Sequence, residues 1–528
     1  MPWNWYNIVD AYTISILTMA GRRCLPFLLL TIYLLLLVCF QSADSSKTSQ
    51  RKKRQYDDNQ ASVLILGAGA AGLQAARYLH DNGMDDFIII EGADYIGGRV
   101  HNVDFAGVKV EMGANWAQPG GTTVVDQVRD LGLETHVSNW DSIIMLNATG
   151  HDVTDDADPS WERLEEAIEK AAELAQNIVD NKLSDMSQRA ALRLSGWVPK
   201  TPIDWCIEWF DYDFEWADTP ERTSLQSTAL LADSEDILFV KDQRGFQFIF
   251  DDIVAFLQED TYLNHVRLNQ VVSTVDQSSE DEVLVTCQDG TVYTGEYVLV
   301  TFGLGVMQSE SVEFIPPLPG WKIEEFYQFI MGSFSKIFVK WPTKFWGDEE
   351  WIVHVNERRG FFPVFFNLEA EGLFPAGTNI LAAFVSGDES RRIEYQSDQE
   401  TIAEIEQVLR GIYGEANVPD AEEILISGWD RNPLHRGAYS NWPVEVSIED
   451  FQKLEARVDR LLFGGEHTDA VYNGYVLGAQ LSGDREAKKI LQCLDGKCPE
   501  PMDTSGSASS ITYTVASVFL VLVAIIMK

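Results

Sequence analysis

The sequence predicts an α/β plus α+β protein with a Rossmann-like nucleotide-binding domain and a discontinuous second domain that contains a mixed sheet and helices. The first observation is the order of elements near the start of the globular part. Residues 62–66 form a short apolar run ending in glycine, residues 70–79 have helical spacing, and residues 87–90 form another apolar run. Strand, helix and strand in this order make a βαβ unit.

The second observation is a set of elements that do not belong to this unit. Residues 161–179 carry apolar side chains at helical spacing among many acids, which is typical of an amphipathic helix. Residues 336–341 and 380–385 read as strands, and residues 399–412 as a helix. These elements predict a second domain, interrupted by returns of the chain to the first.

The charge balance excludes one class of function. The chain has 40 basic and 81 acidic residues, for a formal net charge of -41. Such a chain repels nucleic acid and anionic membranes and attracts cations. The acidity favours a cationic substrate only weakly, since it also serves solubility alone. No spacing of metal ligands is present, so we expect no metal site.

The N-terminal end has the pattern of a secretory signal peptide over residues 1–43. Arg22 and Arg23 precede the apolar run 25–40, which ends at small residues. A polar and basic linker over residues 44–55 follows, and its four basic residues, 51–54, are either a processing site or a solvated linker. The signal predicts entry into the secretory pathway.

The C-terminal residues 503–528 combine a small polar stretch with an apolar tail. This is the pattern of a GPI-attachment signal, with Ser505, Gly506 or Ser507 as the attachment site. The alternative is a marginal transmembrane tail, because a spanning helix needs about 20 apolar residues. In either case we expect an extracellular or cell-surface-anchored protein.

Two further features fit an oxidising compartment. Cys493 and Cys498 flank a four-residue loop, which is short enough for a local disulfide. Asn147 begins an Asn-Ala-Thr sequon, which predicts a glycosylated surface loop.

The turn after the first predicted strand carries the signature of dinucleotide binding. Gly67 allows the tight turn, Gly69 lets the backbone approach a pyrophosphate, and Gly72 permits close helix packing. Glu91 ends the next strand, where a carboxylate accepts hydrogen bonds from the adenosine ribose. The motif stands between a strand and a helix, as dinucleotide binding requires.

A second glycine pair follows, in Ile96-Gly97-Gly98-Arg99-Val100. Arg99 is able to neutralise a pyrophosphate with two parallel hydrogen bonds. This stretch resembles the extended fingerprint of FAD-dependent oxidoreductases.

Several longer motifs make the resemblance closer. They are Val110-Glu111-Met112-Gly113-Ala114-Asn115-Trp116, Phe334-Ser335-Lys336-Ile337-Phe338, Gly437-Ala438-Tyr439-Ser440-Asn441-Trp442, Gly465-Glu466-His467-Thr468 and Tyr472-Asn473-Gly474-Tyr475. Together they resemble the flavin-containing amine oxidase family, and within it the secreted plant-type polyamine oxidases. The resemblance runs from about residue 62 to residue 491.

The resemblance implies roles for five catalytic residues. Lys336 matches the lysine that holds a water against flavin N5. Tyr439 and Tyr475 match the two aromatic positions that sandwich the amine, since aromatic faces attract an ammonium. Glu111 and Glu215 match two carboxylates that line the substrate tunnel, although a solvated acidic loop is the alternative for Glu215.

The same resemblance implies the cofactor and its remaining contacts. Gly113 is assigned to cofactor binding, Glu466 matches a contact to the ribityl and pyrophosphate part of FAD, and Val272 matches a backbone contact to adenine. No cysteine lies near Tyr475, so we expect FAD to be held noncovalently.

The domain boundaries follow from the positions of the motifs and strands. We expect the FAD-binding domain to comprise residues 56–140, 236–330 and 430–495, and the substrate-binding domain residues 141–235 and 331–429. Strands predicted at 283–287, 297–301 and 461–463 belong to the first of these.

The implied reaction is the dehydrogenation of a polyamine of the spermine or spermidine class by hydride transfer to flavin N5. Its products are an aminoaldehyde, a shorter amine and hydrogen peroxide, with oxygen as acceptor. Phe334 and Phe214 stand where the plant-type pattern often has tyrosine, which leaves the amine and the bond open. The alternatives are an oxidase of L-amino acids or monoamines, and a noncatalytic FAD-containing surface binding protein.

Overall fold

The structure is a computed structural model that describes residues 58–118, 124–229, 238–257 and 265–502. The predicted signal peptide, the basic linker and the C-terminal tail lie outside these residues. Among the helices of the described ranges, none combines the length and the apolar character needed to cross a membrane.

The predicted βαβ unit is confirmed. Strand β1 (Gln60–Leu66) leads through the glycine turn into helix α3 (Ala70–Asp81), and β2 (Phe87–Ile90) returns parallel to β1. Both strands are almost wholly buried, as short apolar runs of a parallel sheet are.

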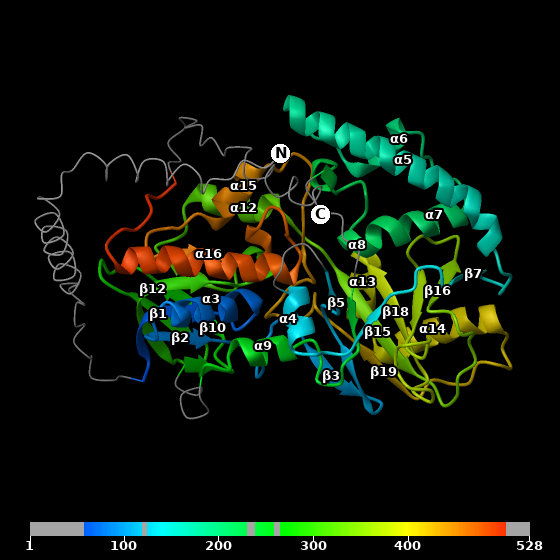
Figure 1. The fold of residues 1–528 in the computed structure, drawn as a ribbon, viewed down its shortest axis with the longest axis horizontal. Coiled ribbons are helices and arrows are strands. Elements are labelled where there is room, and N and C mark those ends of the chain that lie inside the picture. The colour runs from blue at the N-terminus through cyan, green and yellow to red at the C-terminus, as the bar shows by residue number, and fades with distance from the viewer. Residues whose placement is uncertain (1–57, 119–123, 230–237, 258–264, 503–528) are drawn as a thin grey trace, which may run out of the picture. The chain divides into compact units, whose positions relative to one another are not determined.

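This unit belongs to an eight-stranded mixed sheet (Figure 1). Its strand order is β13 (Glu313–Ile315), β10 (Val272–Asp276), β11 (Val283–Cys287), β12 (Val292–Val300), β1, β2 and β9 (Val266–Arg267), and β21 (Leu461–Phe463) lies parallel to β12. Helix α16 (Val476–Leu494) packs on α3 (Figure 1). A Cβ on Gly483 would come within 2.3 Å of the Ala71 carbonyl oxygen, so glycine permits this close helix contact.

A six-stranded sheet forms the other large layer (Figure 1). Its order is β19 (Glu423–Ile426), β15 (Phe334–Lys340), β18 (Ile380–Ser386), β17 (Val364–Asn367), β16 (Trp351–Val355) and β7 (Ile143–Asn147). All neighbours are antiparallel except β16 and β7. The predicted amphipathic helix is present as α5 (Thr154–Asn181), and the predicted helix over 399–412 as α14 (Asp398–Tyr413).

The strands of the two sheets come from the chain segments that were predicted to form the two domains. The eight-stranded sheet draws on residues 60–90, 266–315 and 461–463, and the six-stranded sheet on residues 143–147 and 334–426. The boundaries between the domains stay a prediction.

Shorter elements connect these layers. The small strands are β3 (Asn102–Phe105), β4 (Val108–Glu111), β5 (Trp116–Ala117), β6 (Thr135–Val137), β8 (Leu238–Val240), β14 (Ile330–Met331) and β20 (Ser440–Asn441). The remaining helices are α4 (Val124–Asp130), α6 (Gln188–Leu194), α7 (Pro202–Glu208), the π-helix η1 (Trp209–Asp213), α8 (Phe214–Trp216), η2 (Gln226–Ala229), α9 (Phe248–Ile253), α11 (Leu304–Gln308), α12 (Gly320–Gln328), α13 (Gly387–Tyr395), α15 (Ile448–Glu455) and η3 (Glu466–Thr468).

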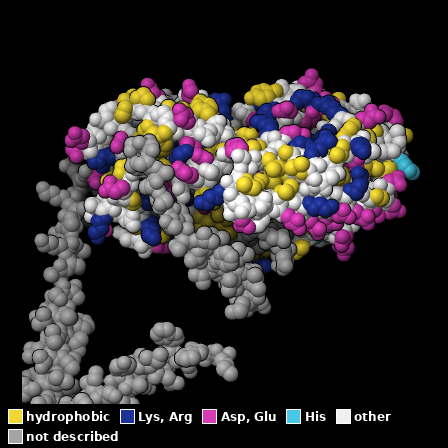
Figure 2. All heavy atoms as spheres, turned by 90° about the horizontal axis from the view of Figure 1, so that it is seen from above, with side chains coloured by type: hydrophobic (Ala, Val, Ile, Leu, Met, Phe, Trp, Pro, Cys, Tyr) yellow, Lys and Arg dark blue, Asp and Glu magenta, His cyan; other side chains and the backbone are white. Residues whose placement is uncertain are grey.

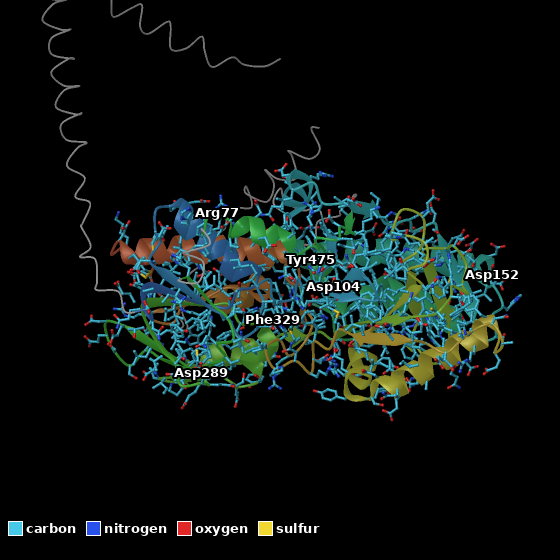
Figure 3. All side chains as sticks on the ribbon, turned by 90° about the horizontal axis from the view of Figure 1, so that it is seen from below. Arg77, Asp104, Asp152, Asp289, Phe329 and Tyr475 are labelled. Atoms are coloured by element: carbon cyan, nitrogen blue, oxygen red, sulfur yellow. A yellow bond between two sulfur atoms is a disulfide. The ribbon has the colours of Figure 1, made fainter. Side chains whose placement is uncertain are left out.

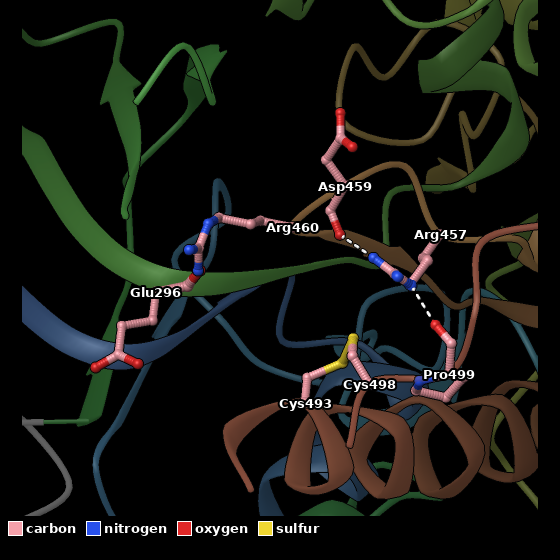
Figure 4. Close-up of a disulfide and its surroundings, with 7 residues drawn as sticks. All are labelled: Glu296, Arg457, Asp459, Arg460, Cys493, Cys498 and Pro499. Atoms are coloured by element: carbon pink, nitrogen blue, oxygen red, sulfur yellow. Dashed lines mark hydrogen bonds between the residues drawn. A yellow bond between two sulfur atoms is a disulfide. The ribbon is translucent and has the colours of Figure 1, made fainter. Parts of the chain in front are cut away.

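The predicted disulfide between Cys493 and Cys498 is present at the end of α16 (Figure 4). Beside it, Arg457 donates from Nε to the Pro499 carbonyl at 2.9 Å, which ties the segment after α16 to the body of the protein. Cys206 and Cys287 are free thiols and are buried. On the face shown in Figure 2, acidic side chains are interspersed with lysine and arginine.

Candidate active site

One cavity of about 1200 Å³ brings most of the predicted site residues together. Its lining includes Gly67, Gly69, Glu91, Arg99, Gly113, Glu215, Val272, Lys336, Tyr439, Glu466 and Tyr475. Gly72 and Glu111 do not line it. In Figure 3, Tyr475 lies between the region of α3, marked by Arg77, and the region that follows β7, marked by Asp152.

The glycine turn forms one end of the cavity. Gly67 has φ +115°, in the region that favours glycine, and a Cβ there would lie 2.6 Å from Thr301 Oγ1. A Cβ on Gly72 would lie 2.0 Å from the Gly67 carbonyl oxygen, so Gly72 serves packing as predicted. Around Gly69, the nearest atom to such a Cβ is Gly98 Cα at 4.0 Å, so glycine there leaves open space over the backbone.

Glu91 holds this turn in shape. Its carboxylate accepts hydrogen bonds from the backbone N–H of Ala68 at 2.6 Å and of Ala93 at 2.8 Å. Burial raises the pKa of Glu91, and the backbone hydrogen bonds oppose that rise. The carboxylate also lines the cavity, and its predicted contact with a ribose stays a prediction.

Arg99 and Glu466 form an ion pair in the wall of the cavity. Arg99 Nη1 lies 2.8 Å from Glu466 Oε1 and donates to the Ala438 carbonyl at 3.0 Å. Glu466 also accepts from Ser440 Oγ and from the Gly474 N–H. Although burial opposes ionisation, Arg99, His467 and Ser440 keep the pKa of Glu466 below its usual value.

Gly113 and Val272 complete the predicted cofactor set. A Cβ on Gly113 would lie 1.8 Å from the Arg99 carbonyl oxygen, so no other residue fits between these two segments. Val272 begins β10 and lines the cavity together with Gln270 and Val271.

Lys336 is buried inside the cavity wall rather than extended to the surface, with only 4% of its area exposed. Its Nζ donates to the Glu111 backbone carbonyl at 3.2 Å and to Asn115 Oδ1 at 3.4 Å. The ammonium also lies 5.2 Å from the centre of the Trp116 ring. Burial lowers the pKa of Lys336 to about 7, and the charge of Glu111 opposes this shift.

Glu111 departs from its predicted place. Its carboxylate does not line the cavity but is buried, with Oε1 accepting from the Phe246 N–H at 2.6 Å. Oε2 has no hydrogen-bond partner among the described residues. Burial raises the pKa of Glu111 to about 7, against the lowering effects of Phe246 and Lys336. The structure thus places this carboxylate outside the lining of the cavity, where it accepts a hydrogen bond from the backbone just before α9 (Phe248–Ile253), and its contact with a substrate stays a prediction.

Tyr439, Tyr475 and Glu215 are in contact with one another in the lining of the cavity. The Tyr475 hydroxyl donates to Glu215 Oε1, and the Tyr439 hydroxyl donates to the Glu215 backbone carbonyl at 3.1 Å. Glu215 is exposed to the cavity, yet the surrounding protein withdraws it from bulk water, and this burial raises its pKa. Glu215 lies on helix α8 rather than in a loop, and its contact with a substrate stays a prediction.

The sequence-based assignment missed part of the lining. Asn115 and Trp116 lie in a quoted motif but received no role, and both line the cavity. Five further residues, three aromatic and two acidic, also line it: Trp140, Trp161, Phe210, Glu165 and Asp211. They come from three separate segments, so no local motif marks them.

The described residues fit FAD on structural grounds. The N-terminus of α3 faces the cavity through Ala70 and Ala71, and its N-cap Gly69 contributes no capping side chain. Free N–H groups at a helix N-terminus bind phosphate. The cavity then continues from this turn to Lys336, which gives one space for a long dinucleotide and its reactive end.

Comparisons with known proteins agree with this geometry. Residues 70–491 match the model of the family described as flavin containing amine oxidoreductase. The chain is 36% identical over 459 residues to polyamine oxidase 1 of Zea mays, covering 82% of this chain and 91% of the relative. It is 37% identical over 443 residues to polyamine oxidase 7 of Oryza sativa subsp. japonica, covering 80% and 93%.

A solved structure of a putrescine oxidase double mutant, made in a redesign of cofactor binding, has the same fold. The TM-score is 0.66 at 21% sequence identity, and the match covers 82% of this chain and 99% of the other. The extent of the family match and the identity to the two plant proteins are decisive for the family. This chain belongs to the flavin-containing amine oxidoreductases.

Proposed function

We propose that this protein is an FAD-dependent oxidase of polyamines of the spermine or spermidine class. The observation that carries the proposal is the single cavity that joins the glycine turn to buried Lys336, the two tyrosines and Glu215. The similarity to plant polyamine oxidases over most of the chain supports the same substrate class.

The chain's own residues hold the cofactor and the amine in this proposal. The α3 N-terminus and Arg99 bind the FAD pyrophosphate, Glu91 the adenosine ribose, and Glu466 the ribityl part. The binding is noncovalent. Bound FAD supplies two-electron oxidation of the carbon beside an amine nitrogen and delivers the electrons to oxygen.

The substrate end of the cavity orients the reacting amine. The rings of Tyr439 and Tyr475 attract and flank the amine, each contact stabilising it by about 0.5 to 2 kcal/mol. Glu215 attracts a second ammonium group of the polyamine, farther from the reacting nitrogen. Lys336 exchanges a proton at Nζ near neutral pH. In the net reaction a secondary amine, water and oxygen yield an aldehyde, a shorter amine and hydrogen peroxide.

The proposal is tested by anaerobic mixing of the purified protein with spermine while the flavin absorbance is followed. Benzylamine and L-leucine are the comparators. Rapid bleaching by spermine alone supports a polyamine oxidase. Bleaching by a comparator alone reassigns the substrate, and no bleaching with any of the three identifies a noncatalytic FAD-binding protein. Acid precipitation, which releases a noncovalent flavin into the supernatant, tests the mode of attachment.

We also propose that the protein enters the secretory pathway, carries a glycan on Asn147 and is attached to the cell surface by a GPI anchor. The Cys493–Cys498 disulfide supports an oxidising compartment. Phosphatidylinositol-specific phospholipase C should release the protein from intact cells. Retention after this treatment, with extraction by detergent, would indicate a transmembrane tail instead.

A further inference from the structure

A π-helical turn lies in the helical stretch that supplies much of the substrate end of the cavity. Helix α7, the π-helix η1 and helix α8 follow one another without a break from Pro202 to Trp216. The cavity is lined by five residues of this stretch: Phe210, Asp211, Phe214, Glu215 and Trp216. π-turns inside α-helices are rare and occur often at functional sites.

Arg359 binds this turn from the loop between β16 and β17. Its guanidinium donates to both carboxylate oxygens of Asp213, at 2.7 and 2.6 Å, and to Glu208 Oε1 at 3.0 Å. Asp213 is 3% exposed and Glu208 is fully buried. Glu208 accepts further hydrogen bonds from Arg189 and from Trp197 Nε1, so it keeps partners of its own.

The contact of one guanidinium with both carboxylates depends on the π-turn. Glu208 and Asp213 are five residues apart, and in an α-helix of 3.6 residues per turn they would point about 140° away from each other. The wider π-turn brings position i+5 back toward the same side of the helix. Arg359 therefore stabilises the π-turn against the α-helical alternative, in which it would lose one of its two partners.

The residues after the π-turn hold the substrate end of the cavity together. Tyr475 donates to the Glu215 carboxylate, and Tyr439 donates to the Glu215 backbone carbonyl. Loss of the extra residue in the turn would change the helix register by one position, which is a rotation of about 100°. Such a rotation would remove Glu215 from Tyr475.

We propose that Arg359 is a positioning residue that sets polyamine affinity by holding the π-turn, and through it Glu215, in place. Arg359 is not itself among the residues that line the cavity, so it acts through the helix. The inference rests on the proposed function for its substrate, but the state of the turn itself can be measured without substrate.

The central test compares Arg359→Met with Arg358→Met. Arg358 neighbours Arg359 on the same loop, is half exposed and pairs with Glu389, outside the π-turn. In R359M, kcat/KM for spermidine should fall at least tenfold, mainly through KM, whereas R358M should stay within twofold of the wild type. The photoreduced R359M protein should react with oxygen at the wild-type rate. An unchanged KM in R359M would overturn the proposal.

A second variant keeps the test valid if R359M folds poorly, since that change leaves Asp213 buried without its cation. The double variant Arg359→Met with Asp213→Asn removes both charges, while Glu208 retains Arg189. It should fold and show the same rise in KM. In a Glu215→Gln background, adding the double change should lower kcat/KM for spermidine by less than a further twofold, because Glu215 is the group through which Arg359 acts. Additive losses would contradict the proposal.

A crystal structure of the double variant separates this inference from the proposed function. An α-helical turn at residues 209–213, with Glu215 no longer bound by Tyr475, would support the inference even if spermidine is not the substrate. A retained π-turn with the Tyr475 contact intact would overturn it, whatever the substrate. Failure of the wild-type protein to oxidise both spermine and spermidine would contradict the proposed function alone.

Discussion

Lys336 and Glu111 are two buried ionisable groups whose pKa values are displaced toward each other. Burial lowers the pKa of Lys336 to about 7 and raises that of Glu111 to about 7. Each charge favours the ionised form of the other, but burial outweighs this effect in both groups, so both pKa values lie near neutral pH. Proton exchange at Lys336 is therefore available near neutral pH.

From the interaction of Lys336 with Glu111 we predict how Glu111→Gln changes the pH dependence of kcat/KM. The Glu111 charge raises the pKa of Lys336, so its removal should let the lysine lose its proton at a lower pH. We expect kcat/KM to rise with pH as Lys336 loses its proton, and in the variant this rise should occur at a lower pH. The measurement is the pH profile with one polyamine, and Lys336→Met should lack this step. A raised KM with an unmoved step would instead place Glu111 against the substrate.

At the scale of elements, the glycine turn and α3 pack too closely for a side chain between them. A Cβ on Gly72 would lie 2.0 Å from the Gly67 carbonyl oxygen and 3.1 Å from Ile65 Cγ2. Both neighbours belong to the buried β1 segment and its turn, which have little room to move. Any side chain at this position therefore separates the helix N-terminus from the strand.

Gly72→Ala should consequently reduce FAD retention. The ratio of flavin to protein absorbance after gel filtration is the measurement, and we expect most of the purified variant to lack FAD. Gly320→Ala is the matched control, because a Cβ there meets no atom within 4 Å. Full retention of FAD by G72A would show that the turn tolerates displacement and would contradict the assigned packing role.

At the scale of the whole molecule, the net charge of -41 acts on any polycation that approaches. Salt screens this attraction, with a Debye length of about 10 Å at 0.1 M. KM for spermine should therefore rise several-fold between about 0.02 and 0.3 M NaCl. Monoamines and diamines serve as controls, because the slope of KM against salt concentration should be smaller for amines that carry fewer positive charges. Equal slopes for all amines would exclude long-range attraction as a contribution to binding.

The sequence by itself determined the elements whose signals are local. The βαβ unit, its glycine turn and strands such as β2 and β11 lie at or near the predicted residues, because apolar periodicity and glycine spacing act over a few neighbouring positions. Most of the site residues that the motifs identified do line the cavity, since each motif keeps its residues on one turn or strand end.

Only the tertiary structure decided which side chains that are distant in sequence contact one another. The Glu111 carboxylate does not line the cavity but accepts a hydrogen bond from the N–H of Phe246, 135 residues later in the sequence. The π-turn at 209–213 depends on Arg359, 146 residues after Asp213. Neither contact leaves a local pattern, because each arises from the packing of separate elements. The sequence specified which chemical groups are present, and packing decided which of them line the cavity.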